Sequence, residues 1–242
     1  LAQVTTSNMD RAMDMVDQVM ELVPYGEQVS FNFPEINPIP EIKKANPPEK
    51  NLDGMVEQSK LIIDKLKAYD STMMPNSGSD ISTINVSVMN SNGVDYSYQA
   101  DTQSLSSVAI LAEEGNILST FRYHMGQEAC QDPGKMADSV IELIKMGRTN
   151  VPCEGGPMPI LFTPYALADI FAAFGAGISG SAVAKGMSPL TGKIGEQIVS
   201  EKLSIVDDGL FPMATGTQPF DDEGIPCQRK YLVENGVLKN YL

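Results

Sequence analysis

The sequence predicts an α+β fold, in which an N-terminal antiparallel sheet with helices is followed by the start of a mainly β domain. Apolar and polar residues alternate from residue 84 onward, as in half-buried strands. Apolar residues at helical spacing precede and follow that region. Residues 149–159 are rich in proline and glycine, which interrupt regular elements. We therefore divide the chain into residues 1–150 and 151–242.

Two helices are expected before the first strand. Ser7 and Asp10 have the spacing of a capping box. An apolar stripe with helical spacing follows and is expected to pack in the core, formed by Met9, Met13, Val16 and Met20. Five prolines between residues 33 and 48 predict a stiff connector. A second apolar pattern predicts a helix over about 52–69.

A meander of antiparallel strands is expected next. Residues 84–88 alternate between apolar and polar types, and Asn90–Gly93 supplies a turn that reaches positive φ. A return strand is predicted over 94–98. The remaining elements of this part are two strands, over 104–111 and 117–124, and a helix over about 134–146.

The second domain is predicted to open with a short strand at 160–162 and then a helix. Thr163 is a suitable N-cap, and Pro164 suits the first helical position. We expect this helix to break up at 175–180, where glycines recur. A hairpin is predicted around Glu234–Gly236 because Asn-Gly favours tight turns.

Composition excludes several classes of function. The formal net charge is −14 and the basic residues are scattered, which argues against binding to a nucleic-acid backbone. Apolar runs are too short to cross a bilayer. The three cysteines form no Cys-x-x-Cys pair, so the cytoplasm is the expected compartment. His124 is the only histidine, which excludes a histidine-rich metal site or a catalytic triad with two histidines.

Residues 195–209, followed by 220–224 and 231–242, resemble in order and spacing the TldD/PmbA family. This family comprises bacterial and archaeal proteins associated with proteolysis and peptide maturation, also labelled modulators of DNA gyrase. The acidic composition does not support direct DNA binding. Since family members extend further at both ends, the resemblance implies a fragment of a longer chain, with residues 1–150 lacking their beginning and 151–242 truncated.

The resemblance also implies which kind of member this is. TldD-type members carry a zinc-binding His-Glu-x-x-x-His helix, whereas PmbA members, also called TldE, lack it and act as partners. Gly180 matches a glycine that follows this motif. Counting back places Phe171 and Ala176 at the histidine positions and Ala172 at the glutamate position. None of these side chains ligates zinc or accepts a proton, so we expect no catalytic residue, metal or cofactor in this chain, and a helix packed as plain core.

Other residues are hallmarks of the family in both kinds of member. They are Gly180, Gly192, Asp207, Asp208, Asp221, Glu223 and Gly224. The acidic members offer oxygen ligands for a cation, but their spacing lacks the alternate-residue pattern of a calcium loop. Short acidic turns also accept backbone N–H groups, which is the role that we favour.

The resemblance implies a non-zinc, PmbA/TldE-like subunit of a metallopeptidase complex. A TldD-like partner would hold zinc and hydrolyse small or unfolded peptides. A homomeric, non-catalytic binding or assembly protein is the alternative, because the same inert helix fits it. A third hypothesis is a self-sufficient hydrolase that uses Cys130 or Cys227, with His124 as the only histidine available to either thiol.

Overall fold

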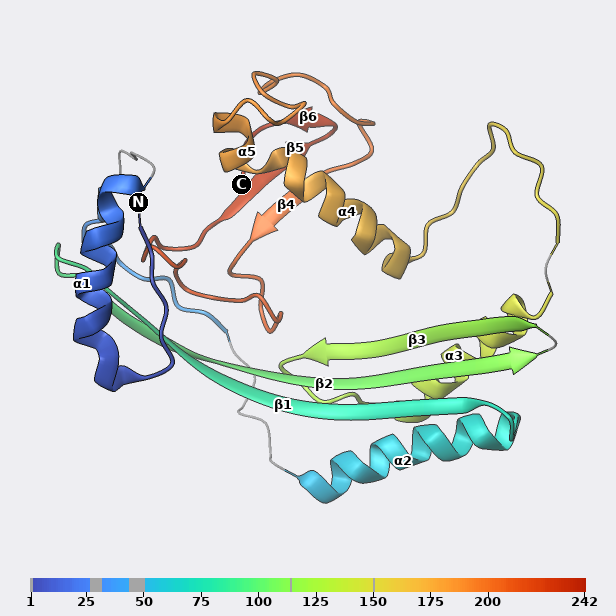
Figure 1. The fold of residues 1–242 in the computed structure, drawn as a ribbon. Coiled ribbons are helices and arrows are strands. Elements are labelled where there is room, and N and C mark those ends of the chain that lie inside the picture. Colours follow the sequence, from blue (N-terminus) through green and yellow to red (C-terminus); the bar gives the residue numbers. More distant parts are fainter. Residues whose placement is uncertain (1, 27–31, 44–50, 114, 150) are drawn as a thin grey trace.

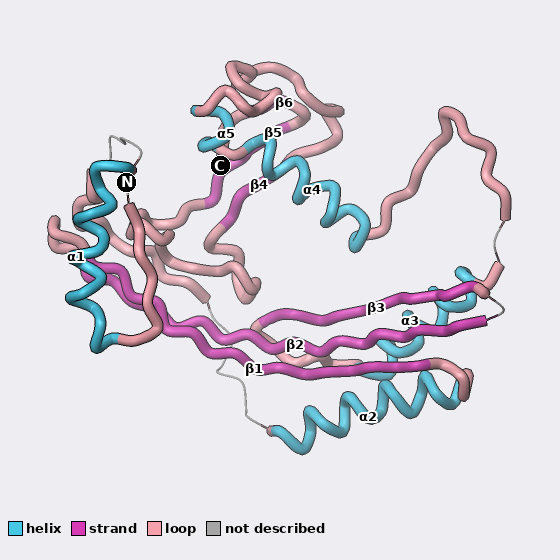
Figure 2. Tube along the Cα trace, viewed as in Figure 1, coloured by secondary structure: helices cyan, strands magenta, loops and turns pink. Residues whose placement is uncertain are grey.

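The chain forms two antiparallel sheets, each accompanied by helices (Figures 1 and 2). The computed structural model describes residues 2–26, 32–43, 51–113, 115–149 and 151–242. In these residues the two sheets have three strands each, in the orders β1-β2-β3 and β4-β5-β6. The mixed architecture with antiparallel pairing confirms the predicted α+β class.

Three long strands form the first sheet: β1 (Met74–Met89), β2 (Asp95–Glu113) and β3 (Asn116–Gly126). The two strands predicted at 94–98 and 104–111 are one strand, because β2 pairs with β1 throughout the polar stretch between them. The predicted turn joins β1 to β2: Asn90 Oδ1 accepts from the backbone N–H of Asn92 at 2.9 Å, and Gly93 has a φ of +90°. Pairing with β1 therefore keeps residues 99–103 in the strand, although apolar and polar residues do not alternate there.

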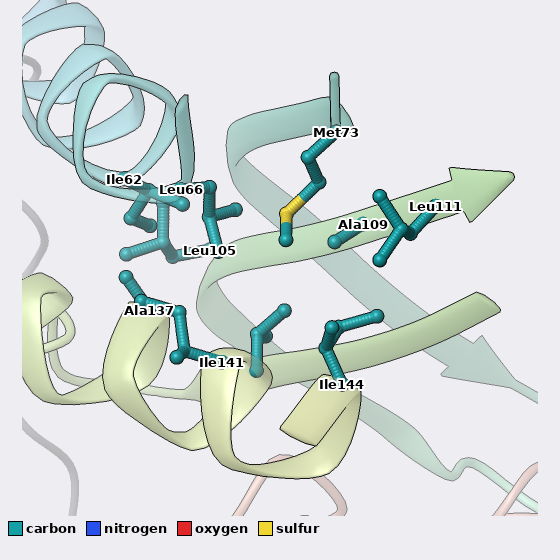
Figure 3. Close-up of a cluster of buried hydrophobic side chains, with 10 residues drawn as sticks. Ile62, Leu66, Met73, Leu105, Ala109, Leu111, Ala137, Ile141 and Ile144 are labelled. Carbon is teal, nitrogen blue, oxygen red and sulfur yellow. The ribbon is translucent and has the colours of Figure 1, made fainter. Parts of the chain in front are cut away.

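Helices α2 (Leu52–Tyr69) and α3 (Pro133–Gly147) cover one face of this sheet (Figure 1). Both begin at a side-chain cap, since Asn51 accepts from Gly54 N–H and Asp132 from Lys135 N–H. Figure 3 shows the core between them and alternate residues of β2. Its buried members are Ile62, Leu66, Met73, Leu105, Ala109, Leu111, Ala137, Val140, Ile141 and Ile144. The predicted positions of both helices are confirmed.

The N-terminal helix differs from the prediction. A 3-10 turn (Met9–Arg11) leads into α1 (Ala12–Leu22), and a second one, η2 (Val23–Tyr25), follows. Asn8, not Ser7, caps the start, because its Oδ1 accepts from Asp10 N–H at 3.0 Å. The predicted core stripe is wrong: Met13 and Met20 are 75% and 64% exposed. Helical spacing shows that these apolar residues share one face of the helix. It does not show whether another part of the protein covers that face.

The proline-rich connector has neither helix nor strand over residues 32–43, as predicted; residues 44–50 lie outside the described part. It runs along the β1–β2 hairpin. Tyr96 Oη donates to the carbonyl of Asn37 at 2.8 Å, and Asn90 Nδ2 donates to the carbonyl of Pro34 at 3.0 Å. Side chains of the hairpin thus satisfy backbone groups that the prolines leave without a ladder.

The C-terminal part begins with α4 (Pro164–Ile178) and α5 (Gly180–Ala184). A small sheet follows: β4 (Ile205–Asp208), β5 (Arg229–Glu234) and β6 (Val237–Leu238). The Asn-Gly hairpin is confirmed, with φ of 49° at Asn235 and 81° at Gly236. The strand predicted at 160–162 does not form.

The two parts meet where the 209–228 loop lies against the β1–β2 hairpin. The ring of Phe220 is 5.5 Å from that of Tyr96 and 5.1 Å from that of Tyr98, both centroid to centroid. Gln127 Nε2 also donates to the carbonyl of Ala214 at 3.1 Å. The domain boundary after residue 150 stays a prediction. Within the described ranges, no helix has the length and apolarity needed to cross a membrane.

Candidate functional site

Helix α4 carries Phe171, Ala172 and Ala176, the positions that the resemblance assigns to the family's zinc motif. Its start follows from the sequence: Thr163 Oγ1 accepts from Ala166 N–H at 3.4 Å, and Pro164 occupies the first turn. Contrary to expectation, the helix continues through Gly175 and Gly177 to Ile178. A glycine in a helix interior costs about 1 kcal/mol relative to alanine, which the rest of the helix offsets.

The three replaced positions lie on this one continuous helix. Phe171 is half-buried, whereas Ala172 and Ala176 are exposed. Only Ile178 of the helix is buried, so the expectation that α4 packs as plain core is wrong. Phenyl and methyl groups offer no lone pair, so the residues present do not fit a zinc ion at these positions. Asp169, also exposed, is the only carboxylate of α4.

The end of α4 is joined to the last residues of the chain. Gly180 N–H donates to the carbonyl of Leu242 at 2.8 Å, and Leu242 N–H donates to the carbonyl of Ile178 at 3.0 Å. Ser188 Oγ donates to the carbonyl of Gly177. A Cβ on Gly180 would lie 2.6 Å from the oxygen of Leu242, closer than real contacts allow. This approach accounts for a glycine at position 180.

Among the acidic hallmark residues, Asp208 and Asp221 accept backbone hydrogen bonds, and Asp207 and Asp208 face cations. Asp221 Oδ1 accepts from the N–H groups of Glu223 and Ile225, at 3.0 and 2.9 Å. Asp208 Oδ1 accepts from Leu210 N–H at 3.1 Å. Ion pairs of 3.5 Å join Asp208 to Arg229 and Asp207 to Lys230 across the β4–β5 ladder. These contacts hold the turns in shape.

The two hallmark glycines in loops are explained by backbone conformation. Gly192 and Gly224 have φ of 76° and 86°, a region that other residues avoid. A Cβ on Gly224 would also lie 3.2 Å from Cγ1 of Val94, where the acidic turn approaches the first sheet.

The acidic turns come together near Cys227. Burial, which is the largest cause, raises the pKa of its thiol, and the carboxylates of Asp221 and Asp207 raise it further. A raised pKa opposes formation of the thiolate, the nucleophilic form of cysteine. The surroundings of Cys227 therefore do not favour the nucleophilic role considered for it.

A separate cavity of about 290 Å³ lies between β3 and α3. His124 and Cys130, which sequence reasoning had considered together, both line it. The Nε2 atom of His124 lies 2.8 Å from the carbonyl oxygen of Glu128. Since a carbonyl only accepts, that nitrogen carries the hydrogen in this contact.

Sequence reasoning missed Arg122, Lys135 and Tyr165, which line the same cavity. Strand register brings Arg122 to the cavity. Arg122 pairs with Ser107, a buried residue on the helix-covered face, so Arg122 also lies on the side of α3. The alternation of residue types in Phe121–Met125 indicates that Arg122 lies on one face of a strand. It does not reveal which helix lies against that face.

Among the described residues, no group of three or more histidine, cysteine or acidic side chains is placed to hold a metal ion. The described surfaces thus offer an inert helix, structural acidic turns and a cavity lined by basic and aromatic side chains. The side chains that line this cavity are suited to binding a ligand.

Comparison with known proteins gives consistent results. A family model described as the PmbA/TldA metallopeptidase C-terminal domain matches residues 155–242. A metalloprotease of Archaeoglobus fulgidus is 30% identical over 118 residues, which cover 48% of this chain and 28% of that protein. A metalloprotease PmbA homolog of Haemophilus influenzae is 27% identical over 155 residues, covering 63% and 34%. The chain thus spans about a third of these relatives' length.

The fold itself is found in a solved structure. TldE from Thermococcus kodakarensis superposes with a TM-score of 0.86 at 22% identity. The match covers 100% of this chain and 56% of that one. At this identity the likeness concerns the fold, and it extends over both sheets.

Proposed function

Because this chain belongs to the TldD/PmbA family, we propose that it is a non-zinc, PmbA/TldE-like subunit of a heteromeric metallopeptidase. In this proposal a TldD-like partner holds the zinc ion and cleaves small or unfolded peptides. The chain completes the assembly without contributing a metal ligand, and it acts in the cytoplasm.

One observation carries the proposal: the three positions that the resemblance assigns to the zinc motif lie on a well-formed helix and hold residues that cannot bind zinc. Phe171, Ala172 and Ala176 all lie on α4, inside an unbroken helix. The helix has a capped start at Thr163, and a close contact at Gly180 follows its end. A well-formed helix without zinc ligands supports a structural role for this helix in a catalytic assembly.

Exposed apolar groups before and along α4 support a contact with another chain. Leu161 is 95% exposed, Ile160 68%, and Ile170 on α4 itself 43%. Apolar groups gathered on a surface are typical of interaction sites. They favour an assembled protein, and both a heteromer and the homomeric alternative satisfy this requirement.

The decisive experiment is affinity purification of the full-length protein from its own cells, with mass spectrometry of the recovered chains. Near-stoichiometric recovery of a relative that carries His-Glu-x-x-x-His is the expected result. Zinc is then measured in each separated chain, and we expect it in the partner alone. Recovery of this protein by itself as a homo-oligomer would favour the binding or assembly alternative. Stoichiometric zinc in this chain would contradict the proposal outright.

A further inference from the structure

Arg122 stands out because it lacks an acidic partner in a strongly acidic chain. The chain has 31 acidic and 17 basic residues, four of the latter being arginines. Three of these form ion pairs, namely Arg11, Arg148 and Arg229. Within the described ranges, Arg122 forms none. A half-buried guanidinium without a carboxylate is a ready receptor for an anionic ligand.

The guanidinium is nevertheless held in place. Its Cζ lies 4.6 Å from the ring centroid of Tyr165, and Nη1 donates to the carbonyl of Phe121 at 2.9 Å. Tyr165 is itself fixed, because its Oη donates to the carbonyl of Tyr123 at 3.3 Å. One of five N–H donors is thereby used. A stacked arginine with donors to spare is preorganised for two parallel bonds to a carboxylate.

The charges around Arg122 fit a monoanion. Its cavity of about 290 Å³ is also lined by Lys135 and Asp132 of the α3 start. Asp132 caps α3, and its Oδ1 accepts from Lys135 N–H at 2.8 Å. Arg122, Lys135 and Asp132 together carry one net positive charge at the cavity. A carboxylate neutralises that charge, whereas a phosphate dianion would leave an excess negative charge beside Asp132.

A second cavity adjoins the basic one. It has a volume of about 320 Å³ and shares Tyr123, His124 and Tyr165 with its neighbour. Its other walls are Met125, Pro164 and Ala168. The first turn of α4 therefore stands where two cavities adjoin, beside β3, an edge strand of its sheet.

We propose that this pair of cavities binds the carboxyl-terminal residue of a peptide. Arg122 and Lys135 bind the free α-carboxylate, and the adjoining cavity takes the side chain of that residue. The identification of the ligand as a peptide rests on the proposed function. The carboxylate recognition follows from the residues themselves, and it assigns a substrate-orienting role to the chain that lacks the zinc motif.

The test is titration calorimetry on the purified protein without any partner chain, so that its outcome does not depend on zinc or on peptidase activity. The probe is acetyl-Ala-Phe with a free carboxylate, and the comparison is the same dipeptide as its amide. We expect the free acid to bind at least about tenfold more tightly, because the amide loses the charge-assisted bonds. Acetyl-phenylalanine and free phenylalanine distinguish a peptide end from a single amino acid.

Variants locate the site. Arg122→Gln and Lys135→Gln should each weaken binding of the free acid by about tenfold, and both should shrink the difference between acid and amide. Lys193→Gln is the matched control: it removes the same charge from a lysine that forms no ion pair within the described residues and lies outside both cavities. Lys135 is exposed, so its variant should fold even where loss of the Arg122–Tyr165 stack lowers stability.

Several results would overturn the inference. They are equal binding of acid and amide, unchanged affinity in both cavity variants, and no binding of the free acid at millimolar concentration. Displacement of the peptide by a lower concentration of inorganic phosphate would identify a phosphate site instead. The copurification result stands apart from all of these, so the proposed function and this site can fail independently.

Discussion

The backbone N–H of Gly180 donates to the carbonyl oxygen of Leu242 at 2.8 Å, and the space between them admits no side chain. This contact joins the α4–α5 junction to the segment that follows β6. A residue that looks like a helix breaker in the sequence is therefore a point of close packing between two backbones.

Substitution Gly180→Ala should destabilise the protein by about 1–3 kcal/mol, because the new methyl group overlaps the Leu242 oxygen and one backbone must move. Gly175→Ala is the control, since nothing lies within 4 Å of a Cβ there. Its stability should stay equal or rise by about 0.5–1 kcal/mol, as expected for alanine in a helix interior. Urea unfolding checks both, and equal stabilities would show that the contact relaxes freely.

The first core gives a second prediction. Leu66→Ala should lower the free energy of unfolding by about 2–5 kcal/mol, because its side chain is fully buried between α2 and the sheet. Leu61→Ala makes the same chemical change on the same helix, at a residue that is 47% exposed, and should cost far less. The comparison is made by thermal and urea unfolding. Similar losses would mean that Leu61 is covered in the full protein.

Asp70 predicts how stability depends on pH. Hydrogen bonds from Thr72, first from its hydroxyl and then from its N–H, lower the pKa of this carboxyl, and Arg148 lowers it further. A lowered folded-state pKa means that the ionised form stabilises the fold above the unfolded value of about 3.9. This stabilisation is lost as pH falls through the lower, folded-state pKa.

Thermal unfolding of the wild type and Asp70→Asn between pH 7 and pH 2 tests this prediction. The variant should be less stable at pH 7, and the difference should shrink at the acidic end. Asp53→Asn, on an exposed residue in the first turn of α2, controls for loss of a charge. A difference that is constant with pH would show that Asp70 contributes no ionisation-linked stability.

Thiol reactivity provides a fourth prediction. Cys153 is exposed, whereas Cys227 is partly buried with a raised pKa, so iodoacetamide at pH 7.5 should modify Cys153 first and Cys227 more slowly. Mass spectrometry of the modified peptides measures the rates. Alkylation of Cys153 and Cys227 should leave any peptidase activity of the complex unchanged, and loss of activity on modification of Cys227 would revive the cysteine hydrolase. Cys130 lines the proposed binding cavity, so its modification is read by peptide binding instead.

Local patterns predicted most of the elements. Helix α2 begins and ends where the sequence indicated, because its spacing of apolar residues and the Asn51 cap both act within one helix. Even so, Leu52 and Val56 of that helix are 70% and 66% exposed and line an open groove of about 680 Å³ beside β1. Helical spacing determines which residues share a face, but the sheet's extent decides which of them are covered.

Local sequence patterns are enough to predict the α+β class, the main helices, the hairpin at Asn235–Gly236 and the inert residues on α4. Each depends on contacts a few residues apart or on side-chain chemistry alone. The exposure of α1, the unbroken strand β2 and the stacking of Arg122 on Tyr165 are seen only in the folded chain. Those outcomes depend on strand register and on distant segments meeting, and neither is encoded in local spacing.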